Sequence, residues 1–416
     1  MDQVTMPNPA VSDRRQLYRP FIERLNPLAP NSSPIQRALI VPREFDPRDP
    51  KQPAINEVFA SAAELNRGTQ MALVGGIGSG KTTELLLTLD RLKSHKDAVN
   101  IFLDAAEFTD FLQTNPGAML AAIGLRLFAQ IRKRFGEPSD EVQSAHAKLR
   151  ELAHGKTEWY DEDPRDYEGD DGRVPVDIPG LMKPRFPQLT QQVEEVSDLL
   201  GTILLPFVDH DSQITVIVDG LDRLIEPVRF REFAEQDLRA IRGTTVTVIA
   251  AAPLLLWFDK SRFLQDYFDL VRHIPAAAAE PRQSVFLKDI LRKRGADELL
   301  SAASINTICR FSGGVLRDLL ELAQSAAQYA YRDAADSIDA AHVRAAVRQL
   351  GNRYLAGVGT AQRLLIRRLI RGKQFSPDSS DSRELLANRQ VLEYSKGGRD
   401  FFLVHPALAK LLPEPQ

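Results

Sequence analysis

The stretch MALVGGIGSGKTT, Met71–Thr83, decides the fold. A short apolar run, Met71–Val74, is followed by Gly75–Thr82, which matches G-x-x-x-x-G-K-[ST] at every fixed position. Glycines at this spacing let the backbone wrap around a phosphate, so that successive N–H groups point at its oxygens. A Gly-rich turn that matched by chance would have no reason to carry a strand pattern before it and a helix pattern after it. The stretch therefore predicts a site for a nucleoside triphosphate.

The residues of this loop have separate expected roles. Lys81 is expected to reach the β- and γ-phosphates of ATP, and the Thr82 hydroxyl to ligate Mg²⁺. The run Thr83–Leu92 has the composition of a helix, whose positive N-terminal end would add to the field on the phosphates. The predicted nucleotide-binding set is Gly75, Gly76, Ile77, Gly78, Ser79, Gly80, Lys81, Thr82 and Thr83.

Composition bounds the class of protein. The chain has 416 residues, enough for two or three domains, and 43% hydrophobic and 26% charged residues are ordinary for a globular protein. The net charge of −3 gives no global sign of nucleic-acid or membrane binding. The single cysteine, Cys309, excludes an internal disulfide framework. With no long apolar run and no signal pattern, we expect a cytoplasmic protein that has no membrane partner.

Four regions are expected along the chain. Residues 1–50 are rich in Pro and Arg and aperiodic, which indicates an extended N-terminal arm. Residues 51–280 alternate helical patterns with apolar runs, which predicts an α/β P-loop core with a parallel five-stranded sheet; the segment 158–187 is an acidic flexible insertion. Residues 281–352 are helical only and form an expected lid. Residues 353–416 join a basic helix to a hairpin pattern, which predicts a winged-helix-like domain.

The run ITVIVDGLDR, Ile214–Arg223, supplies the second half of the expected site. An apolar strand that ends in a carboxylate places Asp219 at the carboxyl edge of the sheet, where nucleotide sites lie. Asp219 is therefore expected to hold Mg²⁺ together with Thr82. Asp222 is a candidate for polarising the attacking water. A helix N-cap is the other interpretation of Asp222, and the two roles are not exclusive.

Taken together, the sequence resembles the AAA+ ATPases, nearest to the branch that holds origin-recognition initiators and STAND-type regulatory ATPases. The resemblance covers roughly Ala54 to Leu350. It rests on the P-loop, on the Walker B-like VIVDGLDR (Val216–Arg223), on the helical lid and on SGGVLR (Ser312–Arg317). The last segment resembles the sensor-2 motif, which implies that Arg317 contacts the γ-phosphate. A solvated arginine in a first helical turn is the alternative.

The chain departs from the family at two positions. Walker B in AAA+ enzymes usually reads Asp-Glu, with Glu as the base, and Gly220 stands in that place here. The family's sensor-1 residue is polar and lies late in strand four, where this chain has Ala250-Ala251-Ala252-Pro253, and Thr247 lies too early. The Asp-Gly-x-Asp form is found in STAND-type members, which are similar to switches more than to motors. We therefore expect slow hydrolysis.

An arginine finger from a neighbouring subunit would stabilise the charge of the transition state. The resemblance places it at Arg262, before strand five, and a homo-oligomer in the ATP state is expected with it. The other candidates, which compete with ordinary surface charge, are Arg239, Arg242 and Arg272.

Two functions from different classes fit these features. In the first, the chain is an ATP-dependent molecular switch on a protein partner; a role in a bacterial defence or stress system is implied by the resemblance alone. In the second, it is an initiator or loader that grips DNA through the 360–373 helix and the 391–404 wing. The Asp-Gly-x-Asp motif and the acidic balance favour the first. A scaffold that binds nucleotide and never cleaves it is a weaker third alternative.

Overall fold

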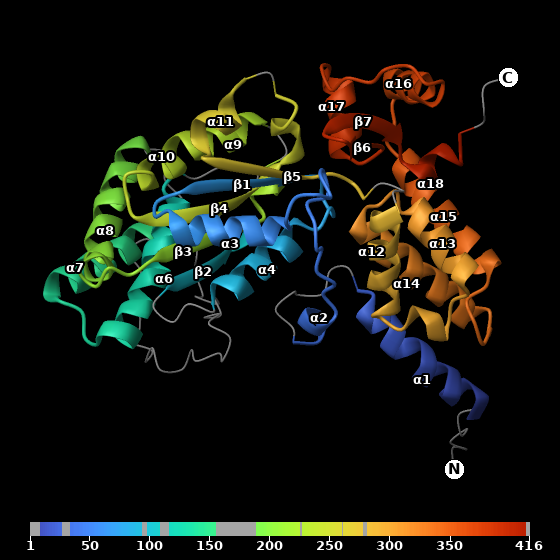
Figure 1. Cartoon of the computed structure of the whole chain (residues 1–416), viewed down its shortest axis with the longest axis horizontal. Coiled ribbons are helices and arrows are strands. Elements are labelled where there is room, and N and C mark those ends of the chain that lie inside the picture. Colours follow the sequence, from blue (N-terminus) through green and yellow to red (C-terminus); the bar gives the residue numbers. More distant parts are fainter. Residues whose placement is uncertain are drawn as a thin grey trace, which may run out of the picture. The chain divides into compact units, whose positions relative to one another are not determined.

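The computed structural model describes residues 9–26, 34–93, 98–108, 116–154, 189–224, 227–259, 261–277 and 281–412 (Figure 1). The insertion expected at 158–187 lies outside the described residues. The chain forms two compact units. We call Ile55–Gly75 with Glu84–His273 the core unit, and Met1–Ala54, Gly76–Thr83 and Ile274–Gln416 the lid unit. The P-loop is thus grouped with the lid unit.

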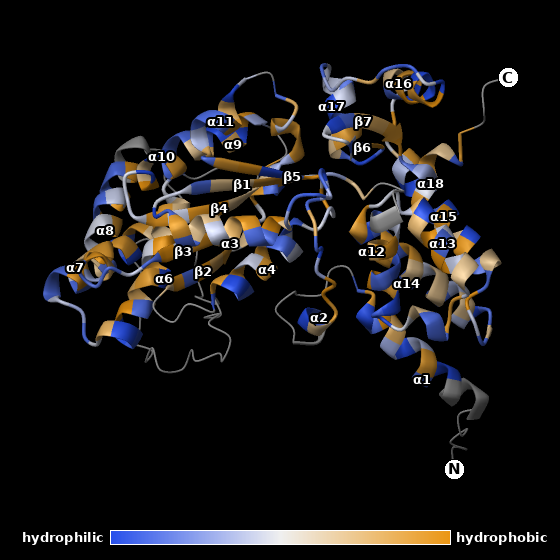
Figure 2. Cartoon of the chain, viewed as in Figure 1, coloured by the Kyte–Doolittle hydropathy of each residue, from blue (hydrophilic) through white to orange (hydrophobic). Residues whose placement is uncertain are grey.

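The core unit is built on a five-stranded sheet with the strand order β2-β3-β4-β1-β5. The pairs β2–β3, β3–β4 and β4–β1 are parallel. Strands β1, β3 and β4 are buried at every residue, which is why the sequence shows unbroken apolar runs there (Figure 2). The strands are β1 (Gln70–Gly75), β2 (Val99–Asp104), β3 (Ile214–Asp219), β4 (Val246–Pro253) and β5 (Leu270–Ile274).

Helices with one apolar face cover this sheet. The largest group is formed by α6, α7 and α8, which pack on one another at the left of Figure 1. The helices are α3 (Ile55–Leu65), α4 (Lys81–Leu92), α5 (Ala105–Phe108), α6 (Ala118–Phe135), α7 (Asp140–His154), α8 (Leu189–Asp209), α9 (Pro227–Phe233), α10 (Arg239–Ile241) and α11 (Phe263–Tyr267). No helix among the described residues is long and apolar enough to cross a membrane.

The lid unit contains a helical bundle and a small helix-plus-hairpin domain. Asp339 caps α15 by accepting hydrogen bonds from the N–H groups of Ala341 and His342. The hairpin turns at Gly397 and Gly398, both at positive φ, which fits a two-residue turn between antiparallel strands. The elements are α12 (Pro281–Arg292), α13 (Ala302–Phe311), α14 (Leu316–Arg332), α15 (Ala340–Leu355), α16 (Thr360–Ile370), α17 (Ser380–Ala387), β6 (Val391–Lys396), β7 (Arg399–Val404) and α18 (Pro406–Ala409).

The expected fold class is therefore confirmed: an α/β P-loop architecture with a five-stranded sheet, a helical lid and a C-terminal winged-helix-like domain. The N-terminal arm differs from the expectation, because it holds α1 (Pro9–Arg24) and α2 (Pro34–Ala38). Tyr18 and Phe21 of α1 and Leu25, which directly follows it, are buried, and α1 packs on α14. Only these few apolar residues carry the helical spacing, and Pro20 interrupts it, so the pattern is hidden in the sequence.

Candidate functional site

The backbone of the P-loop has the form that its glycines permit. The loop links β1 to α4, and Gly78 and Gly80 adopt φ angles of 82° and 105°, which L-residues with a side chain rarely reach. Gly78 also lies in close contact with its surroundings: a Cβ there would sit 2.8 Å from the Cβ of Arg317. These positions therefore require glycine both for the left-handed backbone and for the close approach of a neighbour.

The lysine of the motif lies within the loop. Lys81 is only 5% exposed, and its Nζ donates a hydrogen bond to the carbonyl oxygen of Gly76 at 2.9 Å. Thr82 and Thr83 follow in the first turn of α4 and are half-buried. N–H groups in the first turn of a helix point toward its N-terminal end, and together with an ammonium such as that of Lys81 they are typical of sites that bind an anion.

The start of α14 lies directly against this loop. The Leu316 N–H donates a hydrogen bond to the Gly78 carbonyl oxygen at 2.9 Å, and Arg317 is the next residue. Gly313 and Gly314 precede α14 at positive φ, and a Cβ at Gly314 would lie 1.9 Å from the carbonyl oxygen of Ala277. The two glycines therefore break the preceding helix, as predicted, and allow the turn that brings Arg317 to the P-loop.

Two further arginines, which the sequence reasoning missed, also lie at the loop. Arg43 of the N-terminal arm is 4% exposed and donates to the carbonyl oxygen of Ser79 at 3.2 Å. Arg389, between α17 and β6, has its Nη1 3.5 Å from the position that a Cβ of Gly78 would take. Arg389 has φ of 62°, which is unusual for a residue with a long side chain. Neither residue belongs to a local motif, so only the folded chain reveals them.

A buried acid connects Arg389 to the lid helix. Asp318 of α14 has no exposed surface and accepts hydrogen bonds from Tyr354, from Arg389 Nη1 at 3.0 Å and from His405 Nε2 at 3.3 Å. Burial by itself would raise the pKa of Asp318. The hydrogen bond from His405 and the positive charge of Arg389 outweigh this effect, and the pKa is lowered. The ionised Asp318 therefore holds α14, α15 and the winged-helix-like domain together.

A second buried acid lies near the motif lysine. Glu393 of β6 is 3% exposed, and burial raises the pKa of its carboxyl group well above the usual range. The negative charge of Asp400 raises this pKa further, whereas the positive charges of Arg48 and Lys81 lower it. Arg48 forms an ion pair with Asp400 at 2.9 Å. The β6–β7 hairpin thus carries its own charged cluster close to the loop.

The acid-ended strand β3 lies in the core unit. Asp219 ends this strand, is 8% exposed and is in register with Asp104, which ends β2. Gly220 has φ of 84°, and a Cβ there would lie 2.8 Å from Oδ1 of Asp104. The chain therefore replaces the usual Walker B glutamate by a glycine at a place where a side chain would collide with Asp104. Asp104 could have been found in the sequence, because VNIFLD, Val99–Asp104, is also an apolar run that ends in an acid.

The other predicted residues are placed as follows. Asp222 lies inside the short 3₁₀ helix Leu221–Arg223 and is half-buried, whereas the N-cap position of that helix is Gly220. Thr247 lies near the start of β4, where its hydroxyl donates to the Asn66 carbonyl oxygen at 3.3 Å, so it is far along the strand from the carboxyl end.

Among the finger candidates, Arg262 is exposed immediately before α11. Arg242 is paired with Asp269 at 3.0 Å and donates to the Asp266 carbonyl oxygen at 2.8 Å. Arg239 is exposed on α10, and Arg272 is half-buried in β5. The choice of Arg262 remains a prediction.

The chain thus has the layout that its sequence predicted for an AAA+ P-loop ATPase: a phosphate loop after β1, an acid at the end of β3, a helical lid and a winged-helix-like domain. No protein-family model and no curated protein matches it. Among solved structures, the chain is similar to Orc1 of Aeropyrum pernix in complex with DNA, with 14% identity, 94% of this chain and 96% of that chain covered and a TM-score of 0.44.

Two other similar structures have comparable scores. Cdc6p of Pyrobaculum aerophilum has 13% identity, 90% and 95% coverage and a TM-score of 0.41. The RuvB Holliday junction branch migration motor of Thermotoga maritima has 13% identity, 86% and 93% coverage and a TM-score of 0.38. Because the identities are low, the function is inferred from the chain's own residues.

We predict that replacing Asp318 by Asn destabilises the lid unit in a pH-dependent way. The pKa in the fold lies below the ordinary 3.8, so the stabilisation is fully present above about pH 4 and is lost as the pH falls through the folded value. At pH 7 the variant, which leaves Arg389 without its buried counter-charge, should lose about 3–5 kcal/mol. Urea unfolding followed by circular dichroism from pH 7 to pH 3 should show the difference shrinking on acidification. A constant difference over this range would contradict the role given to Asp318.

Proposed function

We propose that this protein binds Mg²⁺–ATP, hydrolyses it slowly and acts as a nucleotide-dependent switch on a protein partner. One observation carries the proposal: the P-loop is in direct contact with the lid through the hydrogen bond from Leu316 N–H to the Gly78 carbonyl oxygen. Arg317, on the same turn, packs on the same glycine. A phosphate bound by the loop would therefore touch the residues that begin the lid helix.

The residues present fit a bound triphosphate. Gly78 and Gly80 allow a tight loop, because a Cβ at either position would collide with Arg317 or Leu316, and Lys81 lies inside this loop. Positive charge gathers at the loop from Arg43, Arg317 and the N-terminal ends of α4 and α14. An anion at this place would compensate charges that otherwise lie close to one another.

The metal ligands and the base are proposed from the order of the strands. Strands β1 and β3 are separated only by β4, and all three run in parallel, so Gly75 and Asp219 end at the same edge of the sheet. We propose Thr82 and Asp219 as the ligands of Mg²⁺, which when bound supplies charge that bridges phosphate oxygens. Asp222 is the proposed base, and Asp104 is the alternative that the structure adds, because its carboxylate lies where the family's glutamate would begin.

The proposed switch depends on the negative charge of the γ-phosphate, which ATP carries and ADP lacks. The γ-phosphate of ATP offers oxygens that a guanidinium binds in two-pronged fashion, and ADP lacks them. Arg317 would thus hold the start of α14 more firmly in the ATP state. Asp318, the next residue, joins α14 to the winged-helix-like domain, so the state of the loop would reach that domain. In the ATP state we further propose a homo-oligomer with Arg262 as the finger.

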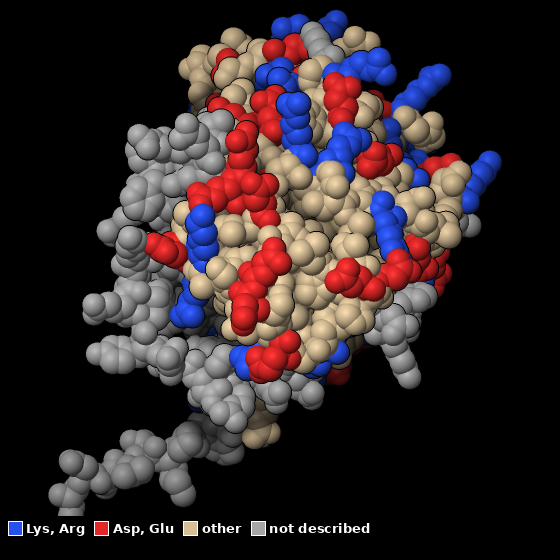
Figure 3. Space-filling model, turned by 90° about the vertical axis from the view of Figure 1, so that its left-hand side faces the viewer, with Lys and Arg blue, Asp and Glu red and all other residues tan. Residues whose placement is uncertain are grey.

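DNA binding is the second candidate function, and the basic face of α16 favours it. Arg363, Arg367 and Arg371 are spaced by four residues and are exposed, and Arg368, Lys373, Lys396 and Arg399 add to the charge. By contrast, acidic and basic side chains are interspersed on the face of the core unit that Figure 3 shows. Any DNA contact would therefore come from 360–373 and 391–404. A nucleotide-bound scaffold without hydrolysis is the third candidate.

The first prediction concerns binding. Lys81→Ala removes the only side-chain cation of the motif, so the affinity for ATP should fall at least tenfold, or about 1.4 kcal/mol. Titration calorimetry with Mg²⁺–ATP measures this change directly. Lys373→Ala, which removes an exposed lysine outside the site, is the matched control and should bind normally. Equal affinities of all three proteins would exclude the P-loop as the nucleotide site.

A second prediction separates the carboxylates of the core unit. Asp219→Asn should weaken Mg²⁺-dependent binding and stop hydrolysis, because the metal loses a charged ligand. Asp222→Asn should bind ATP almost normally and slow phosphate release roughly 10²–10⁴-fold if Asp222 is the base. The same measurement on Asp104→Asn assigns the base to the other acid if only that variant is slow. Full activity in both variants would leave neither acid as the base.

The third prediction tests the switch. Hydrogen exchange at the Leu316 amide, which reports its bond to Gly78, should be slower with a non-hydrolysable ATP analogue than with ADP. Arg317→Ala should abolish this difference without abolishing binding, because a ligand shifts an equilibrium only through its different affinity for the two states. If the wild-type amide exchanges equally in both nucleotides, the switch is wrong and the scaffold is the better description.

A further inference from the structure

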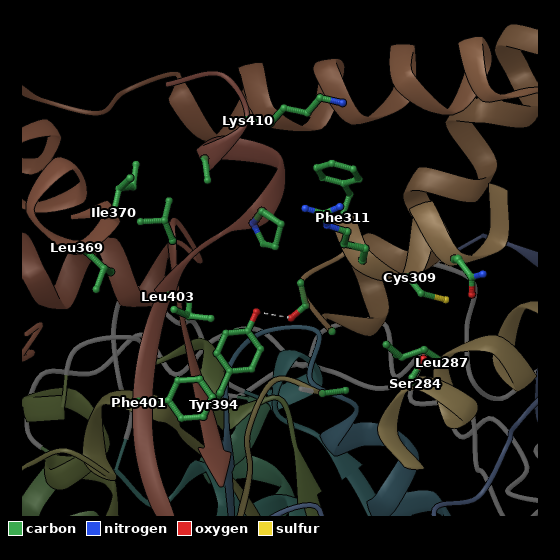
Figure 4. Close-up of a pocket in the computed structure, with 18 residues that line it drawn as sticks. Ser284, Leu287, Cys309, Phe311, Leu369, Ile370, Tyr394, Phe401, Leu403 and Lys410 are labelled. Atoms are coloured by element: carbon green, nitrogen blue, oxygen red, sulfur yellow. Dashed lines mark hydrogen bonds between the residues drawn. The ribbon is translucent and has the colours of Figure 1, made fainter. Parts of the chain in front are cut away.

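A second pocket lies in the lid unit, between the lid helices and the winged-helix-like domain. Its volume is about 1030 Å³, and none of the residues that line it belongs to the P-loop. Figure 4 shows side chains from α12, α13, the end of α16, β7 and α18 that surround it. Pockets of several hundred Å³ with apolar walls and a few polar groups are typical of small-molecule sites.

The walls of the pocket are mostly apolar and carry no acidic side chain. The labelled apolar side chains include Phe311, Leu369, Phe401 and Leu403, and no Asp or Glu is found among the 18 residues that line the pocket. Phe401 and Leu403 remain 37% and 49% exposed, so apolar surface is left open to solvent. The pocket would gain free energy from any apolar body that covers these side chains.

The only charged residues of the lining are cations. Arg310 and Lys410 both lie over the ring of Phe311, with the guanidinium carbon at 5.4 Å and the ammonium nitrogen at 4.7 Å from its centroid. In the part of the chain that the structure describes, neither pairs with an acidic side chain. Two cations beside an apolar wall are complementary to an apolar molecule that carries a single negative group.

We propose that this pocket is a second ligand site, which binds a small amphipathic anion: an aliphatic or aromatic body with one carboxylate or sulfonate group. The apolar body packs on Phe401, Leu403 and Leu369, and the anionic group pairs with Lys410 and Arg310. This site goes beyond the proposed nucleotide switch, because its lining residues lie outside the P-loop and its ligand needs no nucleotide in order to bind.

The pocket is connected to the P-loop by a short path. Phe401 stacks on Tyr394, with ring centroids 5.5 Å apart, and the Tyr394 hydroxyl donates to the Gly313 carbonyl oxygen at 2.9 Å (Figure 4). Gly313 and Gly314 line the pocket, and the next residues lead to the bond between Leu316 and Gly78. A ligand that moves Tyr394 therefore alters the turn that positions Arg317. Binding at the two sites is linked, and each ligand changes the affinity for the other by the same factor.

Direct binding is tested with two probes on the full chain without nucleotide. Anilinonaphthalene sulfonate should bind with a rise in fluorescence, and decanoate should displace it at least tenfold better than decanol, which has the same chain and no charge. Lys410→Glu and Leu403→Asp should each weaken decanoate binding at least tenfold. The matched controls Lys373→Glu and Leu364→Asp change exposed residues that do not line the pocket and should bind like the wild type. Equal displacement by decanol, or equal losses in the controls, would overturn the proposal.

Cys309 gives an independent test of the location. It lines the pocket, it is the single cysteine of the chain, and burial raises the pKa of its thiol to about 11. Alkylation of Cys309 by iodoacetamide at pH 9, followed by mass spectrometry, should therefore be slow. Decanoate should lower this alkylation rate at least fivefold further. An alkylation rate that decanoate leaves unchanged would place the ligand elsewhere and overturn the assignment.

The link to the P-loop has its own measurement. Saturating decanoate should change the ATP affinity of the wild type at least threefold. In Tyr394→Phe, which lacks the bond to Gly313, decanoate at a concentration that saturates the variant should leave the ATP affinity unchanged. An ATP affinity that decanoate does not alter would overturn the linkage. Because the first two tests use no nucleotide, failure of the pocket is distinguishable from failure of the proposed ATP site.

Discussion

The hydrogen bond between the Leu316 N–H and the Gly78 carbonyl oxygen is the contact on which the arrangement of the lid unit depends. It requires two backbones to approach closely, and side chains at Gly78 or Gly314 would prevent the approach. At Gly314, on the far side of the turn, the backbone of Ala277 leaves no room for a Cβ. Gly78 shapes the phosphate loop, and Gly314 lies in the turn between α13 and α14. Both glycines therefore also determine how Arg317 meets the loop. A motif usually explained by phosphate binding is here equally a motif of packing.

The charged side chains around the loop also come from several parts of the chain. Arg43, Arg317 and Arg389 approach the loop from the N-terminal arm, the lid and the winged-helix-like domain. Buried cations are costly unless an opposite charge compensates them. Asp318 does so for Arg389, and Glu393 lies close enough to Lys81 for their charges to influence each other. Three segments distant in sequence thus contribute to one electrostatic centre, so a change of charge at the loop acts on all of them.

Local patterns were sufficient for much of the fold and for part of the site. The buried strands are visible because a fully covered strand must be apolar throughout, and the P-loop because its glycines and lysine lie within eight consecutive positions. Arg43 and Arg389 were missed because their importance arises only when remote segments meet, and no spacing in the chain records that meeting. Asp104 was visible as the acid that ends an apolar run, but only the pairing of β2 with β3 shows that it lies beside Asp219. The helix α1 was missed for another reason: it is amphipathic over few residues and contains Pro20, so its stability comes from packing on α14 and not from its own propensity.

The replacement of the Walker B glutamate follows from the same physical logic. At residue 220 the backbone has positive φ, and the space for a Cβ is taken by the carboxylate of Asp104, so a glutamate there would have a strained backbone and would require the Asp104 side chain to move. In the proposed site, the carboxylate that the family places after the Mg²⁺ ligand would instead come from Asp104 on a neighbouring strand, in register with Asp219. Oδ1 of Asp104 accepts a hydrogen bond from the N–H of Ala106 at 2.9 Å, which fixes its direction. A fixed carboxylate on an adjacent strand is more restricted in its reach than a flexible glutamate on β3 itself. If Asp104 is the base, this restriction would slow turnover without loss of ATP binding, which supports the proposal of a switch that rests in its ATP form.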